Sequence, residues 1–120
     1  MGDGKLFEAE YRLMDIIWEL EPVNSTQLSK VCREKLGWKK PTTYNMLRKL
    51  VQKGMVQNEN AMVTALFKRE EARRAESDAL MERAFNGNVP LFVATLLGGR
   101  KLTEQEAAEL KKMIEEAVER

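Results

Sequence analysis

Residues 37–67 read GWKKPTTYNMLRKLVQKGMVQNENAMVTALF, a helical pattern that is followed directly by a hairpin pattern. Pro41 suits the first turn of a helix, where its missing N–H is no loss, and Gly54 is typical of the residue just after a helix. The spacing of the apolar residues between them predicts an amphipathic helix over residues 41–53. Its inward face is predicted to consist of Thr43, Met46, Leu47, Leu50 and Val51.

Two short segments that are compatible with β-strands follow this helix, at residues 55–57 and 62–67. Both are bounded by polar residues and glycine, as strands of a hairpin usually are. The four residues between them, Asn58–Ala61, have the composition of a turn. A β-hairpin is therefore predicted directly after the helix at residues 41–53.

The segment before residue 37 predicts two further helices, over residues 7–20 and 25–36, because its apolar residues recur at helical spacing. Asn24 or Ser25 is a good N-cap for the second of them. Three helices followed by a hairpin predict a winged-helix domain, which we place at residues 5–68. The predicted fold class is therefore mainly α with a small β-hairpin.

The near-neutral total charge conceals a strongly cationic segment. The chain holds 20 Lys and Arg against 19 Asp and Glu, a net charge of +1. Residues 25–54 hold eight of these cations and a single carboxylate, which gives a local charge of +7. A cationic stretch over the second and third helices indicates a surface for a polyanion, although composition alone also allows an ordinary solvated face.

The outward face of the helix at residues 41–53 combines an aromatic ring with amide and guanidinium groups. Tyr44, Asn45 and Arg48 share this face. Such a combination suits contacts with bases and phosphates better than it suits plain solvent. The alternative is that Tyr44 packs half-buried against a neighbouring helix.

Residues 69–120 predict three helices that cannot bury their apolar residues alone. Helices are expected at residues 70–85, at 89–97 and after Thr103, whose spacing to Glu106 is that of a capping box. The middle helix is apolar nearly all round and requires a partner surface. We expect a homodimerisation region, the alternative being that the helices fold back on the N-terminal domain. The predicted interface comprises Leu80, Phe85, Leu91, Phe92, Leu96, Leu97, Leu110, Ile114 and Val118.

Missing residue types and motifs exclude much of enzyme chemistry. The chain has no histidine, hence no imidazole base, and its single Cys32 cannot form an internal disulfide or a CxxC pair. Cys32 falls at an inward helical position, which favours packing over reactivity. We expect no enzymatic activity, no cofactor and no metal. No apolar run approaches a membrane span and no leader peptide is visible, so a cytoplasmic location without membrane contact is expected.

Three motifs occur in an order and spacing that are specific when taken together. They are Glu10…Met14…Ile17-Trp18-Glu19, then Gly37-Trp38…Thr42…Leu47…Leu50-Val51…Lys53-Gly54, and finally Phe85-Asn86-Gly87 with Lys101-Leu102-Thr103-Glu104…Glu106. On these residues the chain, over residues 6–120, resembles the BlaI/MecI/CopY family of bacterial repressors, which comprises penicillinase, methicillin-resistance and copper regulators.

By this resemblance the protein is expected to be a homodimeric winged-helix repressor that binds a palindromic operator through the helix at residues 41–53. The expected partners are double-stranded DNA and a second copy of the chain. Physically, Asn pairs well with adenine, and Arg pairs well with guanine or phosphate. The residues expected at the DNA are Lys40, Thr42, Tyr44, Asn45, Arg48, Lys49 and Lys53.

The chain departs from the family pattern in three places. Residues 100–120 hold no Cys, so a copper sensor is not expected. Thr95-Leu96 stands where antibiotic-responsive members carry the Asn-Phe pair at which they are cleaved, so that route of release is not carried over. The sequence identifies neither a protease nor a small-molecule inducer. The turn at residues 58–61 carries no cation, so the wing is expected to add little to DNA affinity.

Two other interpretations remain open at the level of the sequence. One is a ligand-responsive winged-helix regulator of the MarR or PadR type, with a small-molecule pocket at the dimer interface. The other is a winged-helix module for protein–protein contact, which has no need of a charge of +7 on its second and third helices. Ligand-dependent release from DNA distinguishes the first, and the absence of DNA binding distinguishes the second.

Overall fold

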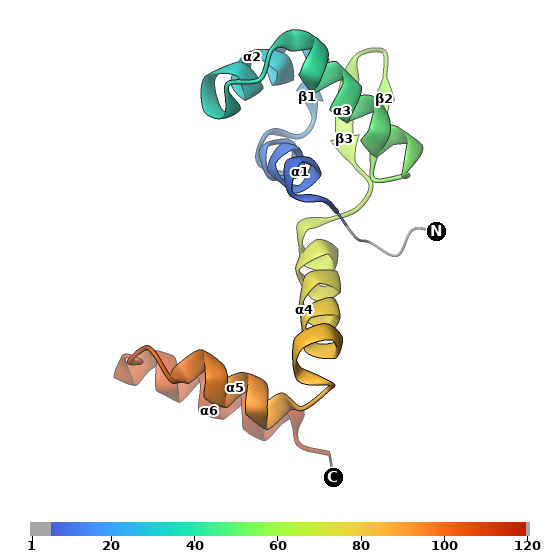
Figure 1. Ribbon diagram of the computed structural model, residues 1–120. Coiled ribbons are helices and arrows are strands. Elements are labelled where there is room, and N and C mark those ends of the chain that lie inside the picture. The colour runs from blue at the N-terminus through green and yellow to red at the C-terminus, as the bar shows by residue number, and fades with distance from the viewer. Residues whose placement is uncertain (1–5, 120) are drawn as a thin grey trace. The chain divides into compact units, whose positions relative to one another are not determined.

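The computed structural model describes residues 6–119, which contain six helices and three short strands (Figure 1). The chain divides into two compact units, Met1–Ala79 and Leu80–Arg120. Lys5 and Arg120, the outer limits of the two predicted domains, lie outside the described residues. The predicted fold class, mainly α with a small β-structure, is confirmed.

Helix α1, Glu8–Leu20, supplies the centre of the first unit. Its first turn is closed by the Glu10 carboxylate, whose Oε1 accepts a hydrogen bond of 2.9 Å from the backbone N–H of Phe7. Leu13, Met14 and Ile17 recur at helical spacing and are fully buried. This face packs against the two helices that follow and against strand β3, Met62–Ala65.

Helix α2, Ser25–Leu36, begins and ends as its sequence predicts. The side chain of Asn24 accepts a hydrogen bond of 2.8 Å from the backbone N–H of Thr26, which satisfies one of the free donors of the first turn. Gly37 ends the helix at φ 70°, a left-handed conformation that costs glycine little.

Helix α3, Lys40–Gln52, follows after a short connection and begins one residue before the predicted start. Thr43, Leu47 and Leu50 are buried, as the helical spacing predicts. The prediction that Val51 also faces inward is wrong, because its side chain is 40 % exposed. Val51 lies one residue beyond Leu50, so about 100° of helical rotation carries it away from the core.

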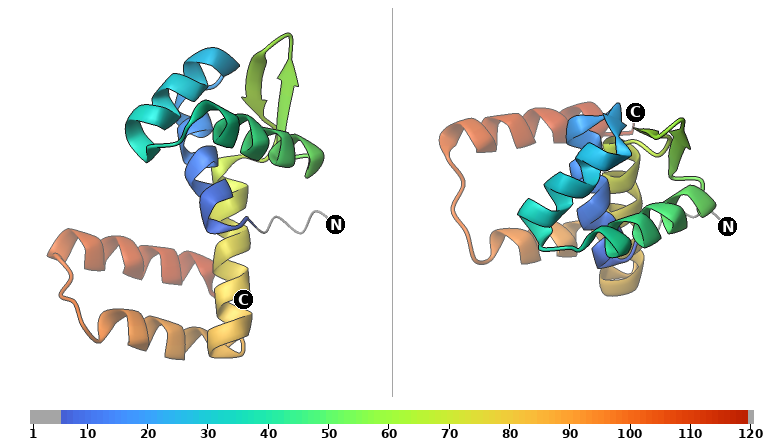
Figure 2. Two further views of the ribbon diagram at one scale, coloured as in Figure 1. Left: turned by 45° about the horizontal axis from the view of Figure 1, so that its top comes forward. Right: turned by 90° about the horizontal axis from the view of Figure 1, so that it is seen from above.

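The predicted hairpin is confirmed, with β2, Val56–Glu59, paired antiparallel to β3. A third strand that the sequence does not predict, β1 at Val23–Asn24, pairs with the other edge of β3 and completes the sheet order β1-β3-β2. Two residues are too few to show the alternation by which strands are recognised. The first view of Figure 2 shows the hairpin beside the later turns of α3.

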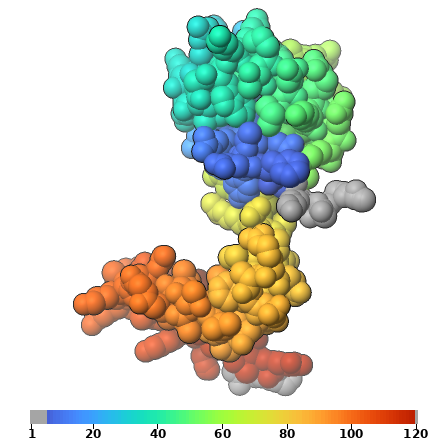
Figure 3. All heavy atoms as spheres, viewed as in Figure 1, coloured from blue at the N-terminus to red at the C-terminus, as the bar shows by residue number. Residues whose placement is uncertain are grey.

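One apolar core holds this unit together, and α1, α2, α3 and the sheet all contribute to it. Figure 3 shows the atoms of α1, α2 and α3 in continuous contact. Trp18, Val31, Leu36 and Tyr44 are partly buried against its rim. The core fixes which faces of α2 and α3 are left to solvent.

Three helices follow the sheet, α4 at Arg69–Phe85, α5 at Val89–Leu97 and α6 at Glu104–Ala117. The capping box predicted before the last helix is present: Thr103 Oγ1 accepts from the backbone N–H of Glu106, and Glu106 Oε1 accepts from that of Thr103. In the second unit, α5 and α6 run in roughly opposite directions and are joined by residues 98–103 (Figure 2). Neither of them has a buried residue among those described.

The two-residue turn of the hairpin predicts a stabilising substitution. Asn60 and Ala61 have φ values of 53° and 64°, the left-handed conformation that a two-residue type I′ turn requires at both positions. Asn tolerates this region, whereas alanine is strained there. Ala61→Gly is expected to raise the free energy of unfolding by about 0.5–1 kcal/mol in denaturant titrations. Asn60→Gly is the matched control with a smaller gain, and a loss of stability in Ala61→Gly contradicts the turn geometry.

Candidate nucleic-acid interface

The solvent face of α3 gathers most of the residues predicted to lie at the DNA. Lys40, Thr42, Asn45, Arg48 and Lys49 are all exposed. They share this face because Thr43, Leu47 and Leu50 commit the opposite face to the core. An exposed helix with these polar groups has the dimensions to enter a DNA major groove.

Arg48 and Asn45 are already in contact in the absence of DNA. Arg48 Nη1 donates a hydrogen bond of 3.1 Å to Asn45 Oδ1. The pair lies one helical turn apart on an exposed surface, which is the spacing at which side chains of a helix meet. The contact orders two long polar groups beside each other and leaves the Asn45 amide N–H groups and most of the Arg48 donors available.

Tyr44 occupies a different position from its neighbours on α3. Its side chain is half-buried and packs against the edge of the apolar core. Lys40 Nζ lies 5.9 Å from the centroid of its ring, within the range of a cation–π contact. The structure therefore agrees with the alternative of a half-packed tyrosine.

The positive charge of residues 25–54 is largely uncompensated. Lys35 lies 3.5 Å from Glu19, and both side chains are more than half exposed, so this pair is weak. Lys53 lies 2.6 Å from Glu10. In the part of the chain that the structure describes, no carboxylate pairs with the cations of residues 25–54 that remain, which are Lys30, Arg33, Lys39, Lys40, Arg48 and Lys49.

Lys53 differs from the other predicted phosphate contacts because its ammonium group is occupied. Nζ bonds to Glu10 Oε1, and the Glu10 side chain is only 4 % exposed. The same ammonium lies 4.6 Å from the centroid of the Phe7 ring. This geometry favours a structural role, in which Lys53 ties the end of α3 to the start of α1. The sequence does not predict this ion pair, because 43 residues separate Lys53 from Glu10.

The wing carries little charge, as the sequence predicts. Residues 57–61, which form most of the outer strand and the turn, are exposed, and Glu59 is the one charged residue among residues 56–65. A carboxylate here is repelled by phosphate rather than attracted. The cationic surface of this unit is thus made by α2 and α3.

The residues predicted for dimerisation lie on helices that have no core of their own. Leu80, Phe85, Phe92 and Leu97 are half-buried, and the Phe85 and Phe92 rings meet edge to face at a centroid distance of 5.2 Å. The other five are exposed, Ile114 by 61 % and Leu91 by 49 %. The exposed members of the predicted set are Leu91, Leu96, Leu110, Ile114 and Val118.

Cys32 is a packing residue. Its side chain is fully buried between α2 and the rest of the core. Burial raises the pKa of the Cys32 thiol above its ordinary value. A protonated thiol without solvent access is a poor nucleophile and a poor metal ligand.

The described residues contain neither a cluster of metal-ligating side chains nor a membrane-spanning helix. Among residues 6–119, no three His, Cys, Asp or Glu side chains gather closely enough to hold a metal ion. Within the same range, every helix is too short or too polar to cross a bilayer.

A winged helix whose third helix presents an exposed, cationic and hydrogen-bonding face belongs to the class of DNA-binding proteins. Comparison with known sequences identifies the group within that class. The penicillinase repressor family matches residues 6–116, and the chain therefore belongs to this family.

A characterised relative agrees with this assignment. The chain is 23 % identical over 116 residues to the penicillinase repressor of Bacillus licheniformis, which covers 93 % of this chain and 91 % of that protein. The resemblance to the BlaI/MecI/CopY repressors is thus confirmed. Members of the family are transcriptional regulators and not enzymes, so the chain is a DNA-binding transcriptional repressor. The family assignment argues against both a MarR-type regulator and a module for protein contact.

The pair of Glu10 and Lys53 predicts a difference in stability between variants of Lys53, which directly follows α3, and of Lys49 within it. Lys53→Met leaves the buried Glu10 carboxylate without its cation and is expected to lower the free energy of unfolding by about 2 kcal/mol. Lys49→Met is the matched control, since Lys49 is exposed and its loss is expected to change stability by less than about 0.5 kcal/mol. Equal stability of the two variants in urea titrations contradicts the structural role of Lys53.

Proposed function

We propose that the chain acts as a homodimer on a two-fold-symmetric operator, with α3 of each protomer in a major groove. The observation that carries this proposal is the exposed face of α3, where Asn45 and Arg48 lie in contact among unpaired cations. Selection of bound fragments from genomic DNA at two salt concentrations tests it. Enrichment of palindromic sites with a steep salt dependence is expected, and sequence-blind binding contradicts it.

The residues of α3 divide into two roles by their chemistry. Asn45 and Arg48 carry the planar groups that read base edges, adenine in the case of Asn and guanine in the case of Arg. Thr42 offers a methyl and a hydroxyl group beside them. Lys40 and Lys49 are flexible point charges that suit phosphates. Tyr44 is half-buried and supports the helix from within.

The apolar helices of the second unit support the dimeric state. The described residues of α5 and α6 include no buried side chain, although α5 is apolar nearly throughout. Val89 is 56 % exposed, Met113 is 57 % exposed and Ile114 is 61 % exposed. An apolar surface of this kind is typical of an interface, and a second copy of the chain covers it with two-fold symmetry. We therefore assign residues 69–120 to dimerisation. As a protein that acts on DNA, the chain is proposed to reside in the cytoplasm.

Arg48 and Lys49, which are neighbours on α3, predict two different DNA-binding defects. Arg48→Ala is expected to lose about 1–3 kcal/mol of preference for operator over scrambled DNA per half-site, because a base contact is removed. Lys49→Ala is expected to weaken binding to both DNAs evenly and to reduce the salt slope by about 1, because a phosphate contact is removed. Fluorescence anisotropy at several salt concentrations measures both. An unchanged preference in Arg48→Ala refutes the base contact.

The dimer interface is tested at a residue that the isolated chain does not bury. Leu96 is 43 % exposed, so Leu96→Asp leaves the fold of the protomer intact and places a carboxylate in the proposed interface. Sedimentation analysis is expected to show monomers, together with weaker operator binding. Gln105→Asp adds the same charge at another exposed position and is expected to remain dimeric. A dimeric Leu96→Asp protein rules out this interface.

A further inference from the structure

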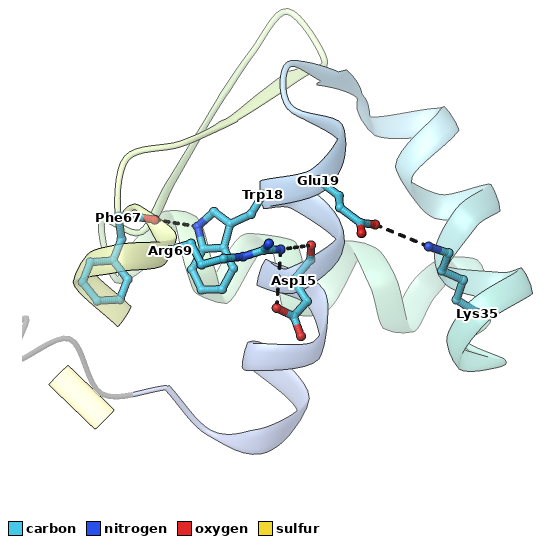
Figure 4. A network of polar contacts seen from close by, with 6 residues as sticks. All are labelled: Asp15, Trp18, Glu19, Lys35, Phe67 and Arg69. Carbon is cyan, nitrogen blue, oxygen red and sulfur yellow. Dashed lines mark hydrogen bonds and ion pairs between the residues drawn. The ribbon is translucent and has the colours of Figure 1, made fainter. Parts of the chain in front are cut away.

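The junction between the winged helix and α4 is held by a cluster of contacts, which Figure 4 shows from close by. Trp18 on α1 donates a hydrogen bond of 2.8 Å from Nε1 to the backbone carbonyl of Phe67, two residues before α4 begins. The Trp18 ring also meets the Tyr11 ring edge to face at a centroid distance of 5.6 Å. An indole fixed from two sides holds the connecting segment against α1.

Arg69, the first residue of α4, closes over the same indole. Its guanidinium carbon lies 5.4 Å from the centroid of the Trp18 ring. Its Nη2 donates a hydrogen bond of 3.2 Å to the backbone carbonyl of Asp15 and lies 3.7 Å from the carboxylate Oδ1 of the same residue. Only a third of the Arg69 side chain is exposed, so solvent weakens these contacts less than those of a free surface pair. We call Asp15, Trp18, Phe67 and Arg69 the junction clamp.

A second set of contacts holds the same segment from Glu21, the residue that directly follows α1. Glu21 Oε1 accepts a hydrogen bond of 2.8 Å from the backbone N–H of Ala65 and lies 3.6 Å from Lys68 Nζ. One turn into α4, Ala72 is 1 % exposed. The strand end, the connection and the first turn of α4 are therefore all attached to α1, and no glycine or proline interrupts the helix from Arg69 to Phe85.

We propose that the junction clamp sets the spacing of operator half-sites that the repressor accepts. This inference rests on the proposed function. A dimer in which α4 of each protomer is a stiff arm reaches both half-sites only when their spacing matches the angle at which α4 leaves the winged helix. The clamp supplies that angle at its origin, because it fixes the first turn of α4 to α1, and α1 is the helix on which α3 packs.

The geometry of DNA makes spacing a sensitive readout of this angle. Inserting one base pair between half-sites moves the second one by about 3.4 Å and turns it by about 35° around the helix axis. A stiff arm tolerates such a change poorly, whereas a loose arm follows it. None of the four clamp residues belongs to α3, so their loss leaves the contacts with a single half-site in place.

The test compares full-length variants on operators that differ only in spacing. The half-site is the sequence that the parent protein selects from random DNA, and the distance between two inverted copies is changed in steps of one base pair. Arg69→Gln removes the guanidinium from Trp18 and Asp15 and keeps a good helix former. Arg74→Gln is the matched control, because Arg74 lies on the same helix with its side chain 81 % exposed. Trp18→Phe is a second clamp variant, which loses the bond to Phe67.

Binding is measured by fluorescence anisotropy, and unfolding curves and affinity for a single half-site establish that each variant is folded. The ratio of affinities between the best spacing and its neighbours is expected to fall at least about threefold in Arg69→Gln and in Trp18→Phe. The ratio in Arg74→Gln is expected to match that of the parent. A parent-like ratio in the folded clamp variants overturns the inference alone. A parent protein that binds paired half-sites no better than one overturns the proposed dimeric function, and the inference falls with it.

Discussion

The apolar packing of α1 against α2, α3 and β3 is the constraint on which the proposed DNA-binding surface depends. Leu13, Met14 and Ile17 are fully buried, and they receive the inward face of α3. Because that face is committed to the core, the helical repeat leaves Asn45 and Arg48 in solvent. The exposed polar face of α3 is thus a consequence of core packing rather than of polar contacts within that face.

The second unit, in contrast to the first, has more apolar side chains than it can bury. Its helices α5 and α6 contain no buried residue among those described, whereas the first unit has a continuous core. A helix such as α5 is marginal in water without tertiary packing. In the dimer that we propose, association of two copies removes this deficit and brings two winged helices together on one DNA.

Local signals in the sequence predict much of this structure, but they do not predict the contacts between segments that are distant along the chain. Pro41 and Gly54 mark α3 within one or two residues, and the capping box at Thr103 marks α6. The pairing of Glu10 with Lys53 joins segments 43 residues apart, and a pattern of charges contains no information about such a partner. The same holds for β1, which is too short to alternate, and for Arg69, whose partner Asp15 lies 54 residues away. For Tyr44, helical periodicity predicts the face of the helix on which the side chain lies, but it does not predict how deeply the side chain is buried.

A methylation-protection footprint of guanine N7 on a selected operator tests the central claim most directly. These atoms lie in the major groove, where we propose that α3 and Arg48 bind. Two protected segments related by two-fold symmetry, with centres one or more helical turns apart, are the expected result. A single protected segment contradicts the dimer, and binding that leaves every N7 reactive contradicts the placement of α3 in the major groove.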